Sequence, residues 1–193
     1  MRRKLKAEHR DVVHRFFGED NVLPQVKMEL VAARKRIEDW PIDDISFCDL
    51  GDGMKRVYKR GRKAMETAYD THTPEDFHDW RKRVNYFWYH TRVMKKTWGP
   101  VVGGLIDELH EMSDLLGDHH DLEELRKMAE GREDLFKDKE EQKALLALID
   151  KRIKELEKAA RKKGKHVYAE KPSDFVDWIG LHWNIWKKKK KKK

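Results

Sequence analysis

The stretch TPEDFHDWRKRVNYFWYHTRVMKKTWGP, residues 73–100, decides the fold class. Thr73, Pro74 and two acids form a strong helix start, because threonine caps free amides, proline suits the first helical position, and acids favour the positive helix end. Gly99-Pro100 ends this helix at about residue 98. Its apolar residues recur at intervals of three and four, which predicts one buried stripe: Phe77, Trp80, Val84, Phe87, Thr91, Met94 and Trp98.

The same spacing recurs on both sides of this stretch. A loop is expected over residues 49–53, and Gly117 is expected to separate two helices. No segment alternates as a strand would, so short loops between helices predict an all-α fold of antiparallel bundles. The other helices are expected over 4–17, 22–39, 54–69, 101–116, 118–130, 137–163 and a last one opened by Pro172. The second of these carries Val22, Val26, Leu30, Ala33 and Ile37 at helical spacing.

The positive charge of the chain is local. The 193 residues carry a net charge of +8, but residues 187–193 are all lysine, and without them 37 basic residues face 36 acidic ones. Residues 54–96 hold twelve lysines and arginines against five acids. A nearly neutral protein with one basic strip suggests a defined site for a polyanion rather than general adhesion to acidic surfaces.

Composition also bounds the cellular setting. Cys48 is the single cysteine, which rules out an internal disulfide framework and fits a reducing compartment. No run of about twenty apolar residues is present, and the N-terminus lacks the apolar stretch of a secretory signal. A cytoplasmic protein is therefore expected.

Two basic rows are candidates for the binding site. The face opposite the apolar stripe of the 73–98 helix carries cations and hydrogen-bond donors in one line, which could follow the phosphates of an extended polymer. The preceding helix adds a second basic row, and two such rows on adjacent helices would form a groove. The candidate ligands of a polyanion in these two rows are Arg56, Lys59, Arg60, Lys63, His78, Arg81, Lys82, Asn85, Tyr89 and Arg92.

Other readings stay open at this point. The charges could be ordinary solvated surface, the ligand could be RNA or another nucleic acid, or the chain could be a helical scaffold. Asp118-His119-His120-Asp121 suggests a metal site, but neighbouring residues on a helix point about 100° apart, which disfavours convergence on one ion. No phosphate-binding loop or nucleophile motif is present, so neither an enzyme nor a cofactor is expected.

Three segments resemble the CHAD domain, a helical domain named for its histidines. They are GDGMKRVYKRGRKAM (51–65), FHDWRKRVNYFWYHTRVM (77–94) and MSDLLGDHHDLEELRKM (112–128), in the order and spacing of that family. His78, Arg81 and Lys82 match its HxxRK motif, and His120 matches its LGDxHDL motif. Lys59, Arg60 and Arg62 match the basic helix that precedes them.

The resemblance implies a fold of two pseudo-repeated four-helix bundles around a channel lined by basic residues and histidines. CHAD proteins bind inorganic polyphosphate and associate with polyphosphate granules, often beside or fused to triphosphate-tunnel enzymes. The expected function is therefore non-catalytic binding of polyphosphate. The alternatives are an RNA-binding helical protein and a scaffold partner of a triphosphate-hydrolysing enzyme.

The chain departs from the family pattern in two places. Asn85 stands where the family commonly has lysine, and the HxxR helix of a first repeat is not visible. Residues 1–50 are expected to be a partial first repeat and 51–186 the CHAD-like bundle. The chain would then be a fragment, or a short form that completes its channel as a homodimer. The lysine run 187–193 is expected to be a disordered tail or a tag.

Overall fold

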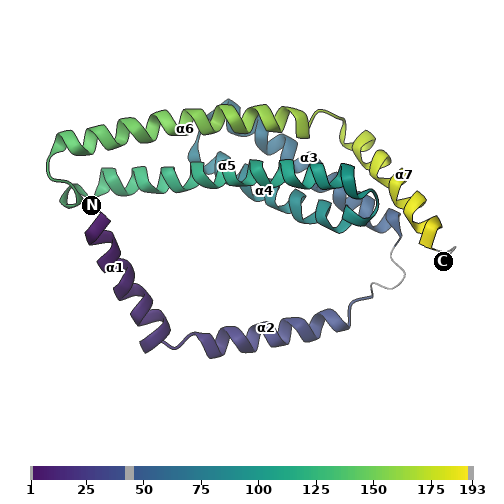
Figure 1. Ribbon diagram of the computed structural model, residues 1–193, viewed down its shortest axis with the longest axis horizontal. Helices are drawn as coiled ribbons and strands as arrows, with labels where there is room; N and C mark the ends of the chain where they lie inside the picture. Colours follow the sequence, from purple (N-terminus) through teal and green to yellow (C-terminus); the bar gives the residue numbers. More distant parts are fainter. Residues whose placement is uncertain (1, 42–45, 191–193) are drawn as a thin grey trace.

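The computed structural model describes residues 2–41 and 46–190, and every regular element in these ranges is helical (Figure 1). The expected all-α fold is confirmed. The α-helices are α1 (Arg2–His14), α2 (Leu23–Glu38), α3 (Phe47–Thr71), α4 (Pro74–Val93), α5 (Gly99–Gly131), α6 (Lys139–Val167) and α7 (Pro172–Lys190). A π-helical turn covers Arg15–Glu19, and 3-10 turns cover Met94–Lys96 and Glu133–Leu135.

Helices α3 to α6 form a bundle in which each helix packs on the next along the chain, and α7 crosses α3. The core lies between them and is rich in aromatic residues. Trp80, Val84 and Phe87 of α4 are fully buried, and Tyr58 of α3 lies edge-on to Phe87 with ring centroids 5.4 Å apart. The stripe predicted for the 73–98 helix faces the core from Phe77 to Met94. Regular helix gives way at Met94 to a 3-10 turn, so the helix ends earlier than predicted, and Trp98 is 42% exposed.

Helix α3 begins earlier than its sequence suggests, and the predicted loop over residues 49–53 is wrong. The backbone amide and hydroxyl of Ser46 both donate to the carboxylate of Asp49, at 2.8 and 2.6 Å, which fixes the first turn. Gly51 is buried, and a Cβ there would lie 3.3 Å from the ring of Phe47 and 3.5 Å from Val176 of α7. This glycine serves close packing rather than a turn.

The predicted break at Gly117 is also wrong, because α5 is continuous from Gly99 to Gly131. A glycine inside a helix costs about 1 kcal/mol relative to alanine, which neighbouring packing readily offsets. Within the described residues no helix is both long and apolar enough to span a bilayer.

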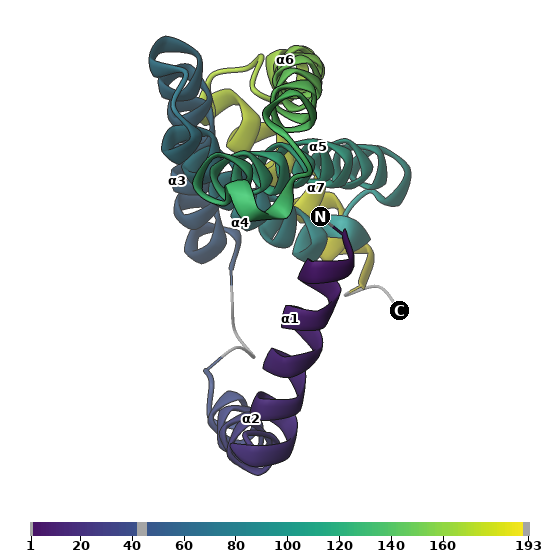
Figure 2. The same cartoon turned by 90° about the vertical axis from the view of Figure 1, so that its left-hand side faces the viewer.

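Helices α1 and α2 form an arm that stands away from the bundle (Figures 1 and 2). Neither helix contains a buried residue, and Val26, Leu30 and Ile37 are 50%, 66% and 48% exposed. The helix predicted over 22–39 is confirmed, but its apolar stripe is exposed, because no other described helix packs closely against it. Among the contacts that tie the arm to the bundle, Arg132 donates to both carboxylate oxygens of Glu8 at 3.0 Å.

The lysine run is helical where it is described. Helix α7 continues through Lys190, whereas the sequence predicted disorder from residue 187; Lys191–Lys193 lie outside the described residues. Lysine is a good helix former, and cations near a helix C-terminus interact favourably with the helix dipole. These two effects extend the tryptophan-rich helix beyond its packed part.

Candidate functional site

The orientation of α4 places its polar residues against α5. Thr73 caps the helix by accepting a hydrogen bond from the amide of Asp76 at 3.3 Å, as its sequence predicted. Burial of Trp80 and its neighbours on the stripe then fixes the rotation of the helix. Because successive residues turn by 100°, His78, Arg81 and Asn85 lie on the side that meets α5.

Facing residues meet in pairs along these two helices. The rings of His78 and His120 lie 4.6 Å apart, and Ser113 donates from its hydroxyl to Asn85 Oδ1 at 2.6 Å. The guanidinium of Arg81 lies over α5 at Gly117, where a Cβ would be 3.7 Å from Nε. We call this zone the polar interface; it comprises His78, Arg81, Asn85, Trp88 and Arg92 on α4 and His110, Ser113, Gly117 and His120 on α5.

Several nitrogen atoms in the polar interface lack a partner. Within the described part of the chain, His78 Nδ1, Arg81 Nε and Trp88 Nε1 are buried and have no hydrogen-bond partner. No carboxylate oxygen of a described residue lies within 4.0 Å of the Arg81 guanidinium, so its charge is not neutralised by an ion pair. Unpaired buried donors are costly, and an anion that accepts from them would remove that cost.

The surroundings of His78 lower the pKa of its imidazole. Burial lowers the pKa of its imidazole below the usual 6.5, and the nearby His120, Lys82 and Arg81 lower this pKa further, against a smaller opposing effect of Asp79. The ring is therefore predominantly neutral near pH 7 and carries one N–H donor. A bound anion would stabilise the protonated ring and raise this pKa.

Aromatic rings at the far end of the polar interface are already engaged. The guanidinium of Arg92 lies 5.1 Å from the ring centroid of Trp88 and 5.9 Å from that of Tyr89. His110 meets Trp88 edge-on at 4.8 Å, and its Nδ1 lies 2.9 Å from the carboxylate of Asp114. The Trp88 ring thus supports a cation at this point and is not an open stacking platform.

The outer rim of the polar interface has mixed charge. Lys82 is exposed and pairs with Asp79 at 3.2 Å. Lys82, His78 and His120 line a shallow hollow of about 350 Å³, whose other walls are Pro74, Glu75, Glu123, Glu124 and Lys127. Lys82 therefore contributes less uncompensated charge than Arg81.

The predicted residues of α3 lie elsewhere. Arg60 and Lys63 line a hollow between α3 and α4, together with Asp79 and Arg83 of α4. Arg62 turns to the opposite flank of α3, where it donates to the backbone carbonyl of Glu170 at 3.2 Å. Arg56 and Lys59 are exposed on the same helix. The structure therefore does not bring the two predicted rows together in one groove. His78 and Arg81 face α5 on one flank of α4, whereas Arg60 and Lys63 lie at the other flank of α4.

Of the four α5 residues in the polar interface, the sequence indicated only His120, through the family resemblance, and the other three were missed. His110, Ser113, Gly117 and His120 follow one another at intervals of three, four and three, which is the spacing of one helix face. The expected break at Gly117 concealed that spacing. Read as one helix, residues 99–131 would have presented these four residues as a single line.

A model of the CHAD domain matches residues 26–130, which is more than half of the chain. The chain belongs to the CHAD-domain family. The matched span of this CHAD domain runs from α2 almost to the end of α5 and so includes both sides of the polar interface. No curated protein and no solved structure matches the chain.

The Asp118–Asp121 segment of the CHAD domain does not converge on one point. The ring of His119 is buried and stacks on Phe77 at 4.5 Å, while His120 faces His78. Among the described residues, no three or more histidine, cysteine, aspartate or glutamate side chains are grouped to hold a metal ion. The two histidines thus serve different sides of α5, one in the core and one at the polar interface.

Proposed function

We propose that this CHAD domain binds inorganic polyphosphate along the α4–α5 polar interface and catalyses no reaction on it. The family as a whole is associated with polyphosphate binding, which supports this ligand class. The observation that carries the proposal for this chain is Arg81. Its guanidinium is held in the interface without a carboxylate partner and with a buried Nε that lacks an acceptor.

The arrangement suits a phosphate polymer without bases. Arg81 and Arg92 supply forked donors eleven residues apart, about 16 Å along the helix axis. His78 and the amide group of Asn85 add neutral donors at the end near Arg81, because Ser113 already satisfies Asn85 Oδ1. Such a line can contact several phosphates of one extended chain. Association of the protein with polyphosphate granules in the cytoplasm belongs to the same proposal.

RNA is the competing ligand, because Tyr86 and Tyr89 are 51% and 55% exposed on the outer face of α4. Single-stranded nucleic acids are held by stacking of bases on aromatic rings as well as by charge. Arg92, however, is drawn onto the Tyr89 ring, so the two tyrosines do not form a pair of open platforms. The structure offers charge for phosphates more readily than successive platforms for bases.

Competition between the two polymers tests the proposal. Wild-type protein is first bound to labelled polyphosphate as the probe. Unlabelled long-chain polyphosphate and RNA of matched total charge are then titrated as competitors, and the binding of polyphosphate is measured again with an Arg81→Ala/Lys82→Ala variant. We expect polyphosphate to displace the probe at clearly lower charge concentration than RNA, and the variant to bind polyphosphate weakly. Equal competition by RNA, or undiminished binding by the variant, would overturn the proposal. Both titrations are repeated on chains without residues 187–193, since seven lysines bind polyanions on their own.

A further inference from the structure

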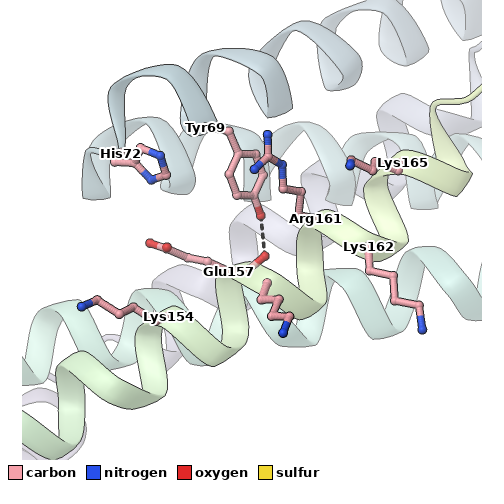
Figure 3. Close-up of a pocket in the computed structure, with 8 residues that line it drawn as sticks. Tyr69, His72, Lys154, Glu157, Arg161, Lys162 and Lys165 are labelled. Carbon is pink, nitrogen blue, oxygen red and sulfur yellow. Dashed lines mark hydrogen bonds between the residues drawn. The ribbon is translucent and has the colours of Figure 1, made fainter.

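Helix α6 carries a row of cations on the side of the bundle away from the polar interface. Lys154, Lys158, Arg161, Lys162 and Lys165 lie at offsets of four, seven, eight and eleven residues, which places all five on one face. The row rises about 16 Å along the helix. All five residues are exposed, and together with Tyr69 and His72 of α3 they line a hollow of about 400 Å³ (Figure 3).

These cations are not neutralised by the protein. Within the described ranges no carboxylate oxygen lies within 4.0 Å of a nitrogen of any of the five. Lys163 on the opposite face of the same helix shows the contrast, because its ammonium group pairs with Glu108 at 2.9 Å and Glu111 at 2.6 Å. Lys163 thus pairs with the acids of α5 that lie within its reach, whereas none of the five cations of the row pairs with a carboxylate of a described residue.

The one acid in the hollow is engaged elsewhere. Glu157 Oε1 lies 3.4 Å from Nε2 of the buried His119, and its backbone carbonyl accepts a hydrogen bond from the Tyr69 hydroxyl at 2.6 Å. Figure 3 shows the Tyr69 contact and the Glu157 side chain directed away from Lys162 and Lys165. The net charge of the lining is therefore strongly positive, with five cations against one carboxylate.

Arg161 fixes the middle of the row. Its guanidinium lies 4.7 Å from the centroid of the Tyr69 ring, and Figure 3 shows it turned toward that ring while Lys162 extends in the other direction. Tyr69 is held in place by its hydrogen bond to α6, and burial raises the pKa of its hydroxyl, so it stays neutral. Because Arg161 covers the Tyr69 ring, that ring is not an open platform for a base, and the row of cations favours bare phosphates.

The position of this strip makes it independent of the polar interface. Helix α4 packs between α3 and α5, and α6 packs on α5, so the α3–α6 side of the bundle lies opposite the α4–α5 side. We propose that the α6 strip is a second site for a linear phosphate polyanion, and that one molecule thereby holds two polyphosphate segments on opposite sides. The choice of polyphosphate as the ligand rests on the proposed function; the existence of the strip does not.

Calorimetric titration with short-chain inorganic polyphosphate tests this inference. It is carried out on the full chain and, because seven lysines bind polyanions on their own, also on the chain without residues 187–193. The variant Lys158→Ala/Lys162→Ala/Lys165→Ala removes three exposed charges and keeps Arg161, which packs on Tyr69. Its matched control, Lys137→Ala/Lys139→Ala/Lys143→Ala, removes three exposed lysines from the other end of the same helical region. We expect the first variant to bind about tenfold more weakly at the α6 strip, so that one of the two binding events is lost from the titration. The slope of log affinity against log salt concentration should fall by about two.

The outcomes separate the two proposals. Melting curves first confirm that both triple variants fold as wild type does. If the α6 variant titrates like its matched control, the second site is wrong, whatever the polar interface does. If the Arg81→Ala/Lys82→Ala variant binds normally while the α6 variant loses one event, the strip stands and the proposed function of the polar interface fails. If each of these two variants loses one binding event and keeps the other, the result supports both the second site and the proposed function of the polar interface.

Discussion

Replacing Arg81 and Arg92 together by alanine is expected to weaken polyphosphate binding at the polar interface by about a hundredfold or more. Each guanidinium would form charge-assisted hydrogen bonds, which contribute about 1.5–3 kcal/mol apiece, and 1.4 kcal/mol corresponds to a factor of ten. The salt dependence should also fall, because fewer counterions are displaced when two phosphate contacts are lost. Binding isotherms at several ionic strengths measure both quantities.

The matched control for this variant is Arg3→Ala/Arg10→Ala. It removes the same two charges from exposed positions of α1, outside the span that matches the family. We expect the control to reduce binding only slightly, through the general field of the protein. An equal loss in the two double variants would mean that net charge, rather than the geometry of the polar interface, determines binding.

Gly61→Ala is expected to destabilise the bundle by about 1–3 kcal/mol, the usual cost of overpacking a core. A Cβ at Gly61 would overlap the hydroxyl of Tyr168 and lie 2.9 Å from its Cζ. Tyr168 cannot move aside, because it is buried and packed edge-on to Tyr58 with ring centroids 5.4 Å apart. Thermal unfolding monitored by circular dichroism should show a melting temperature lower by several degrees.

Gly103→Ala serves as the control with the opposite sign. Gly103 also lies inside a helix, but among the described residues no heavy atom beyond its chain neighbours and the adjacent backbone of α5 lies within 4 Å of the position of its Cβ. Alanine there should stabilise α5 by about 0.5–1 kcal/mol through lower entropy of the unfolded chain and better helix propensity. If both substitutions changed stability in the same direction, the close approach of α3 to Tyr168 would not be what requires glycine at position 61.

Much of the fold could be predicted from the sequence, and the failures share one cause. The start of α4 at Thr73 and its buried stripe from Phe77 to Met94 were predicted correctly because the cap and the apolar spacing are local signals, whereas its end was placed five residues too late. Gly51 and Gly117 were read as turns, but both lie inside helices, at places where Phe47 and Arg81 approach the backbone closely. A glycine in the sequence is equally compatible with a turn and with a side chain that approaches a helix backbone closely, and only tertiary packing distinguishes these two roles.

The site was predicted only in part for a related reason. Helical periodicity gave the line of His78, Arg81 and Asn85 on α4, but it could not say which neighbour that line faces. The structure pairs it with α5 and leaves Arg60 and Lys63 on the other flank of α4. The exposed stripe of α2 shows the same limit, because amphipathic spacing predicts a buried face without naming what would cover it.

The pKa of the His78 imidazole tests the central claim most directly, and nuclear magnetic resonance can follow it with and without short-chain polyphosphate. In the free protein, burial and then the neighbouring cations hold this pKa below 6.5. A phosphate chain in the polar interface favours the protonated ring, so the pKa should rise on binding and affinity should increase as pH falls toward and below 6.5. A His78 pKa that does not change under saturating polyphosphate, while the protein demonstrably binds it, would place the ligand elsewhere and contradict the account.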